Sequence, residues 1–168
     1  NAIINNSGIR NDGSMNYGDK KKPLTKNDDT IDRIKNGNKR FQYGKVAREQ
    51  SFNEIIDFLD YLKKHDIYVI AFFPPFSNLV YDEIQKIKYN YEYMAKSSKR
   101  LSSIFKNYGY EFWDFSNPLI IGSTDSEFIN GFHGGEITYA KKLFYMSENN
   151  SIIKQYFDIA KLKSDLNK

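Results

Sequence analysis

The chain has 168 residues, of which 40% are apolar and 27% charged, and these values are typical of one globular domain with a hydrophobic core. It has no cysteine, which excludes disulfide bonds, a thiolate nucleophile and cysteine-based zinc sites. The net charge is +4 and the pI about 9.0, but apart from Lys20–Lys22 the lysines are spread along the chain, so we predict no nucleic-acid partner.

The sequence also lacks the patterns of a membrane helix, a metal site and a signal peptide. No apolar run approaches the roughly 20 residues of a membrane helix, so we predict no membrane segment. With two histidines and no cysteine, we predict neither a metal site nor a cofactor. The sequence starts at Asn1 without a signal-peptide pattern, and we expect an N-terminal portion of the protein to precede it.

Residues 1–50 are predicted to be a loop-rich segment that wraps the domain. Glycine, asparagine and aspartate recur there in turn-forming groups, such as Asn11-Asp12-Gly13-Ser14. One short helix is predicted from Thr30 to Asn36, with Asp29 or Thr30 as its N-cap and Gly37 as its end.

The first long helix is predicted to begin at Ser51 and to end near Lys63-Lys64-His65. Ser51 and Glu54 have the spacing of a capping box. Apolar residues then recur at helical spacing, so we expect one face of this helix to pack on a sheet. The residues of that face are Phe52, Ile55, Leu59 and Leu62.

Two apolar runs, Ile67–Phe73 and Tyr110–Phe115, are predicted to be strands. The first is continuous and rich in β-branched and aromatic residues, which is typical of a strand buried on both faces. Pro74-Pro75 ends it because proline cannot continue the ladder. Each run follows a helix after a short connection, so we predict that the two are adjacent or near-adjacent parallel strands of one sheet.

The remaining helices are predicted from spacing and from capping residues. A helical region, continuous or broken in the middle, is expected over 78–107, with Gly109 closing it. Ser116 to Gly134 is predicted to be a loop, followed by a helix over 135–147. Ser151 is expected to cap a final helix that contains Ile152 to Ile159.

The element order predicts an α/β fold, a three-layer parallel sheet with helices on both faces, and residues 51–168 would form the C-terminal part of this single domain. Two parallel strands alone do not make a stable sheet. Either residues 1–50 contain another strand, for example around Ala2 to Ile4, or the other strands lie in a preceding portion or a partner chain. We therefore expect the sheet to be incomplete in this chain.

Candidate ligand-binding residues follow the carboxyl ends of the two strands, where open parallel sheets bind their ligands. Ser77 and Asn78 follow the first strand and either bind substrate or cap the next helix. Asp114 ends the second strand and is a candidate of the same kind, or a turn residue. Farther along lie His133 and Gly134, where flanking glycines allow close approach of a ligand.

The segment after the second strand resembles the last block of the SGNH/GDSL hydrolases, in which Asp-x-x-His follows the final strand of the sheet. Asn130-Gly131-Phe132-His133 occupies that pattern here. Residues 135–140, 72–76 and 11–14 also resemble SGNH-like proteins of bacterial envelope and surface-polysaccharide systems. The resemblance covers about residues 10–145 and implies an SGNH-type, flavodoxin-like sheet.

The resemblance implies that His133 is the general base for a serine nucleophile and that Asn130 orients it. Asn130 can accept a hydrogen bond from the ring through its carbonyl, but it cannot stabilise an imidazolium by charge. Asp125, Glu127 or Asp114 could supply that charge if the loop brings one of them close. The family's serine follows the first strand in a Gly-Asp-Ser-like turn that opens a helix. Ser14 has neither an apolar strand before it nor a helix pattern after it, and Ser7 has only Ala2-Ile3-Ile4 ahead of it, so we expect the nucleophile outside this segment.

These observations predict an SGNH-like esterase or O-acyltransferase that acts on acyl groups of a cell-surface glycan or on a small ester, in or outside the bacterial envelope. The alternative is a non-catalytic SGNH-like domain that binds glycan or protein, which Asn130 and the missing serine favour. A structural or nucleic-acid-associated domain is supported by the pI alone. A Gly-Asp-Ser-like turn after an apolar strand would distinguish the enzyme from the binding domain.

Overall fold

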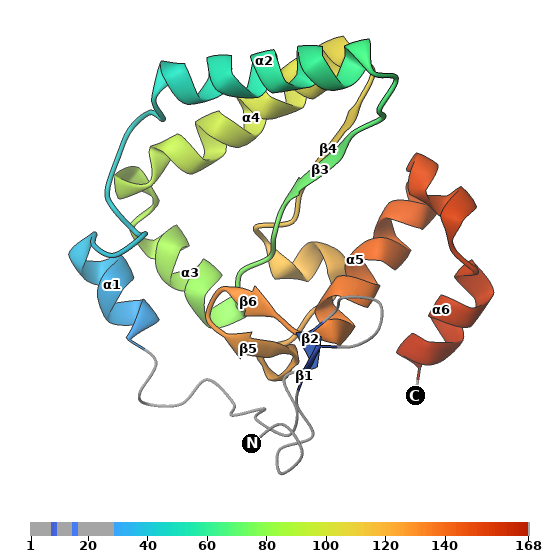
Figure 1. Cartoon of the computed structure of the whole chain (residues 1–168). Helices are drawn as coiled ribbons and strands as arrows, with labels where there is room; N and C mark the ends of the chain where they lie inside the picture. Colours follow the sequence, from blue (N-terminus) through green and yellow to red (C-terminus); the bar gives the residue numbers. More distant parts are fainter. Residues whose placement is uncertain (1–7, 10–14, 17–28, 168) are drawn as a thin grey trace.

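The structure is a computed structural model that describes residues 8–9, 15–16 and 29–167. The described part is a helix-rich mixed α/β fold (Figure 1). A two-residue antiparallel pair, β1 (Gly8–Ile9) and β2 (Met15–Asn16), comes first. The predicted turn at residues 11–14 and the suggested strand around Ala2 to Ile4 lie outside the described residues.

The centre of the fold is a parallel pair of strands, β3 (Ile70–Phe73) and β4 (Glu111–Asp114). Ile70 pairs with Glu111 and Phe73 with Asp114, so both strands end at the same level. The prediction of two adjacent parallel strands is confirmed. Figure 1 shows the pair running from the long helices at one end toward the β5–β6 hairpin at the other.

One face of the pair is covered by α2 (Glu49–Lys64) and α4 (Glu92–Tyr108), which lie side by side. Phe52 and Leu59 of α2 pack with Leu101 and Phe105 of α4 and with apolar residues of both strands, Phe73 among them. Burial of this apolar surface is the main stabilising contribution at this face. The predicted helix face therefore packs on the sheet through Phe52, Ile55 and Leu59, whereas Leu62 is half-buried outside this cluster.

The start of α2 differs from its prediction. The helix begins at Glu49, with Arg48 as N-cap and no side-chain capping bond, so the predicted capping box at Ser51 is wrong. Ser51 already lies inside the first turn, where its backbone N–H donates to Arg48 O. The predicted end is confirmed, because His65 is the C-cap and its N–H donates to Leu62 O.

The first strand is shorter and less buried than predicted. It begins at Ile70, whereas Ile67 and Tyr68 precede it with exposed side chains. Phe72 is also 38% exposed. Burial on both faces was therefore the wrong prediction, because the second face is covered only in part, by Phe115, Ile121 and Met146 and the residues around them.

The long helical region is broken, as one of the two sequence alternatives allows. It consists of α3 (Asn78–Lys86), the 3-10 turn η1 (Lys88–Asn90) and α4, which ends at Gly109 in a left-handed conformation. The predicted short helix is α1 (Thr30–Asn36), and Gly37 ends it, also left-handed. Ile34 of α1 packs with Val80 and Ile84 of α3 in a separate core cluster.

The segment from Ser116 to Gly134 is more ordered than the predicted loop. It forms the 3-10 turns η2 (Pro118–Ile121) and η3 (Asp125–Glu127), then an antiparallel hairpin of β5 (Phe128–Asn130) and β6 (His133–Gly134). The helix predicted over 135–147 is α5 (Glu136–Glu148). Ser151 caps the 3-10 helix η4 (Ile152–Tyr156) instead of a continuous helix, and α6 (Ile159–Leu166) starts anew at Asp158.

The fold class is confirmed at the level of a mixed α/β domain. Over residues 29–167, β3 and β4 form the only parallel pair, so a three-layer sheet of the SGNH type remains a prediction. Within the described part of the chain, no helix has the length and apolarity needed to cross a membrane.

Candidate functional site

The β5–β6 hairpin is fixed beyond the carboxyl end of β3. The N–H of Ser77, which follows the strand, donates to Gly131 O at 3.0 Å. Gly131 is required at this contact, because a Cβ there would lie 2.6 Å from Val80 Cγ2 and 3.0 Å from Thr30 Cγ2. The sequence therefore places the hairpin tip, with His133 on it, against the start of α3.

The structure brings Asn130 and His133 together. Asn130 Oδ1 accepts the backbone N–H groups of Phe132 at 3.1 Å and of His133 at 2.9 Å, which closes the turn. Nδ1 of the His133 ring lies 2.8 Å from Asn130 Nδ2 and 3.0 Å from Oδ1. The predicted contact between the two side chains is confirmed, and the ring is held through Nδ1 on an exposed residue.

The two backbone donors determine the orientation of the Asn130 amide, since an N–H can bond only to its oxygen. They also occupy both lone pairs of that oxygen. The closer ring contact is then a bond from Asn130 Nδ2–H to an unprotonated Nδ1. This arrangement favours the neutral tautomer of His133 with its proton on Nε2, whereas a general base needs Nε2 free.

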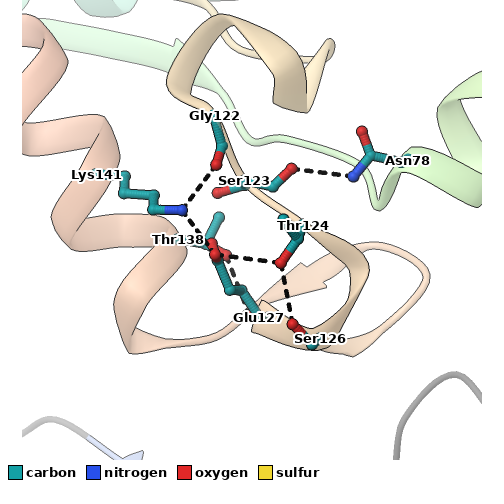
Figure 2. A network of polar contacts seen from close by, with 8 residues as sticks. All are labelled: Asn78, Gly122, Ser123, Thr124, Ser126, Glu127, Thr138 and Lys141. Atoms are coloured by element: carbon teal, nitrogen blue, oxygen red, sulfur yellow. Dashed lines mark hydrogen bonds and ion pairs between the residues drawn. The ribbon is translucent and has the colours of Figure 1, made fainter. Parts of the chain in front are cut away.

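A polar network holds the loop that leads to the hairpin (Figure 2). Lys141 of α5 donates to Gly122 O at 2.7 Å and forms a 2.6 Å ion pair with Glu127 Oε1. Thr138, also on α5, donates to Glu127 O, and Thr124 donates to Glu127 Oε1. The loop is thereby bound to α5 before it enters β5. The sequence analysis missed this ion pair, whose partners lie 14 residues apart.

None of the three acids considered as substitutes for the Asn130 carboxylate contacts His133 in the described structure. Glu127 pairs with Lys141, and its other carboxylate oxygen is buried without a hydrogen-bond partner among the described residues. Asp125 Oδ1 accepts Leu79 N–H at 3.4 Å, and Asp114 Oδ1 accepts Ser116 N–H at 2.9 Å. Asn130 is thus the side chain that positions the ring.

Ser77 and Asn78, predicted as ligand residues, hold the structure together at this end of the sheet. The Ser77 side chain is fully buried, and its Oγ caps α3 by accepting Val80 N–H. Asn78 Nδ2 donates to Ser123 O at 3.0 Å, as Figure 2 shows, and so ties α3 to the loop. Gly134 is buried, and a Cβ there would lie 2.8 Å from Thr138 Cγ2, so its position serves close packing on α5.

Asp114 lies in the wall of a cavity of about 480 Å³ between β4, α3 and α4. Tyr81, Tyr89 and Lys88 are among the other wall residues. Burial raises the pKa of the Tyr81 phenol, and the nearby carboxylate of Asp114 raises it further. The cavity combines aromatic faces, two acids (Asp114 and Glu92) and two lysines, a set that suits a polar ring such as a sugar.

The cavity and His133 lie at the same end of the parallel pair but do not share a wall. Phe132, next to His133, contacts Phe41 edge-on at a centroid distance of 6.1 Å, and Phe41 in turn contacts Phe76 of the cavity wall at 6.3 Å. The predicted site residues therefore fall into two groups, one around His133 and one around Asp114, separated by aromatic rings.

We compared the chain with models of protein families, with curated proteins and with solved structures, and none of the three comparisons gives a match.

Proposed function

We propose that the chain is part of an SGNH-like esterase or O-acyltransferase that acts on acyl groups of a cell-surface glycan or of a small ester. The observation that carries the proposal is the exposed His133, whose Nδ1 lies 3.0 Å from Asn130 Oδ1 on a hairpin that docks beyond the end of β3. In this account Nε2 faces the substrate and removes the proton of an attacking hydroxyl. We expect the serine that supplies this hydroxyl to lie outside this segment.

General-base catalysis requires the other hydrogen-bond arrangement of the Asn130–His133 pair. For Nε2 to accept a proton, Nδ1–H must donate to Asn130 Oδ1, which lies 3.0 Å away and already accepts two backbone donors. An amide also leaves the imidazolium without a compensating charge. We therefore expect a slow hydrolase whose rate is limited by Asn130.

A second candidate function is a non-catalytic SGNH-like domain that binds glycan or protein. It is favoured by the orientation of the Asn130 amide, since an Nε2–H on His133 is a hydrogen-bond donor to a sugar oxygen or a carbonyl group. The aromatic cavity beside Asp114 also fits a sugar. The two functions require opposite tautomers of His133.

Ester hydrolysis by a protein that carries both this chain and the expected serine tests the first proposal, with 4-nitrophenyl acetate as the probe. His133→Ala is expected to lower the rate by about 10²-fold, or to the rate in buffer alone, because general-base catalysis is lost. His65→Ala is the matched control and should leave the rate unchanged, since His65 lies at the far end of α2 and packs on Tyr61. Equal rates for His133→Ala and the unmodified chain would exclude the hydrolase and leave the binding domain.

A further inference from the structure

Lys142 occupies a position on α5 where the helix pattern calls for an apolar residue. Thr138, Lys142 and Met146 follow at intervals of four and are buried, so they form one stripe along the inner face of the helix. Lys142 is only 4% exposed. Lysine is almost never buried to this degree without a charged partner.

The amine of Lys142 lies between aromatic rings. Nζ is 3.2 Å from the centroid of the Phe72 ring and 4.5 Å from that of Tyr139. Among the described residues, no carboxylate pairs with it. Its neighbour Lys141 is the opposite case, with an ion pair to Glu127 and a hydrogen bond to Gly122 O.

The rings of Phe72 and Tyr139 form an aromatic cage, and it affects the protonation of the amine in two opposite ways. Ring faces attract a cation, typically by about 0.5–2 kcal/mol. Removal from water disfavours the cation more strongly, and burial lowers the pKa of Lys142 from the ordinary 10.5 to about 8. Neither ring residue, Phe72 or Tyr139, has a carboxylate that would hold the proton on the amine.

The cage also has a side that faces solvent. Phe72, on the outer face of β3, is 38% exposed, so one wall of the cage is itself a surface residue. Access of a small molecule to the amine therefore requires displacement of this ring. A buried amine that is partly neutral near pH 7 and lies behind one partly exposed ring has the properties of a nucleophilic lysine.

We propose that Lys142 is a reactive amine that condenses with small aldehydes. The neutral amine adds to the carbonyl carbon through its lone pair, and the carbinolamine loses water. This leaves a C=N bond between Nζ and the former aldehyde carbon, so one water is released and no oxidant or reductant is needed. The site is independent of the function proposed for His133.

Reductive methylation of the full chain with formaldehyde and cyanoborohydride at about pH 7 tests this reactivity. Mass spectrometry of peptides at short times gives the rate at each lysine. Lys142 is expected to react about tenfold faster than Lys141, the matched neighbour, because reaction requires the neutral amine. A rate at Lys142 equal to or below that at Lys141 would overturn the proposal.

A second experiment tests the charge state of Lys142 without a chemical reagent. In Lys142→Met, the midpoint of urea unfolding is compared with that of the unmodified chain as the pH rises. Above pH 8 the folded chain carries a neutral Lys142, whereas the unfolded chain keeps the proton up to about 10.5, so unfolding takes up a proton. The unmodified chain should therefore gain stability relative to Lys142→Met across this window. Midpoints that move in parallel would show that the amine stays charged, contrary to the proposal.

Discussion

In a protein that also carries the expected serine, replacing Asn130 by aspartate is expected to leave the rate of ester hydrolysis equal or to raise it, by as much as about 10⁴-fold, which is the effect attributed to the reverse change in a serine protease. The structure gives the reason. An aspartate has a second carboxylate oxygen where Asn130 now has Nδ2, 2.8 Å from Nδ1 of His133. That oxygen can only accept, so Nδ1 must carry the proton and Nε2 becomes free to act as a base.

The fold is expected to tolerate Asn130→Asp, because the other oxygen still accepts the backbone N–H groups of Phe132 and His133. Asn117→Asp is the matched control. Asn117 lies in the same loop, and its Oδ1 also accepts a backbone N–H, that of Leu119. The tautomer is read directly from the ¹⁵N shifts of the His133 ring, with His65 as a reference in the same spectrum. A clear fall in rate in Asn130→Asp would show that the Asn130 amide donor is required.

The Leu59→Ala variant is expected to lose about 2–5 kcal/mol in its free energy of unfolding, the usual cost for a buried leucine. Leu59 is 1% exposed at the centre of the cluster that joins α2 and α4 to the parallel pair. Its removal leaves a cavity that rigid helices cannot fill completely. Urea unfolding monitored by circular dichroism measures the change.

Phe58→Ala is the control for Leu59→Ala, since Phe58 is adjacent on α2 but 59% exposed. Its free energy of unfolding should change by less than about 1 kcal/mol. Equal losses for the two variants would show that the inner face of α2 has been assigned wrongly.

Helices and the parallel pair could be predicted from the sequence because their signals are local. The spacing of Phe52, Leu59 and their neighbours fixes a helix face, and glycines such as Gly37 and Gly109 end helices in a left-handed conformation. The order of helix and apolar run then implies a parallel pair. The start of α2 was misjudged, because a capping box is a short signal and the helix gains one more half-turn from Glu49.

The loop between β4 and α5 could not be predicted, because its order comes from contacts distant in the sequence. Ser123 O meets Asn78, Glu127 meets Lys141, and Gly131 meets Ser77 and Val80. Burial of the strands was overestimated for a related reason. A run such as Ile67–Phe73 shows that the side chains are apolar. Their burial depends on which elements from elsewhere in the chain cover them.

The candidate site was predictable in part. The i, i+3 spacing of Asn130 and His133 in a turn is local, and the structure confirms their contact. The roles of Ser77 and Asn78 at a strand end were open from the sequence, and the contacts show a cap and a loop anchor. Lys142 escaped notice, although its spacing from Thr138 and Met146 would have revealed a lysine on an apolar stripe.

The most direct test of the central claim is the rate of 4-nitrophenyl acetate hydrolysis by the double variant Asn130→Asp, His133→Ala compared with Asn130→Asp alone. If His133, positioned by residue 130, acts on the ester, the gain caused by the aspartate depends on the histidine, and the double variant should be as slow as His133→Ala. A double variant that keeps the rate of Asn130→Asp would contradict the account, because the ester would then be hydrolysed without His133.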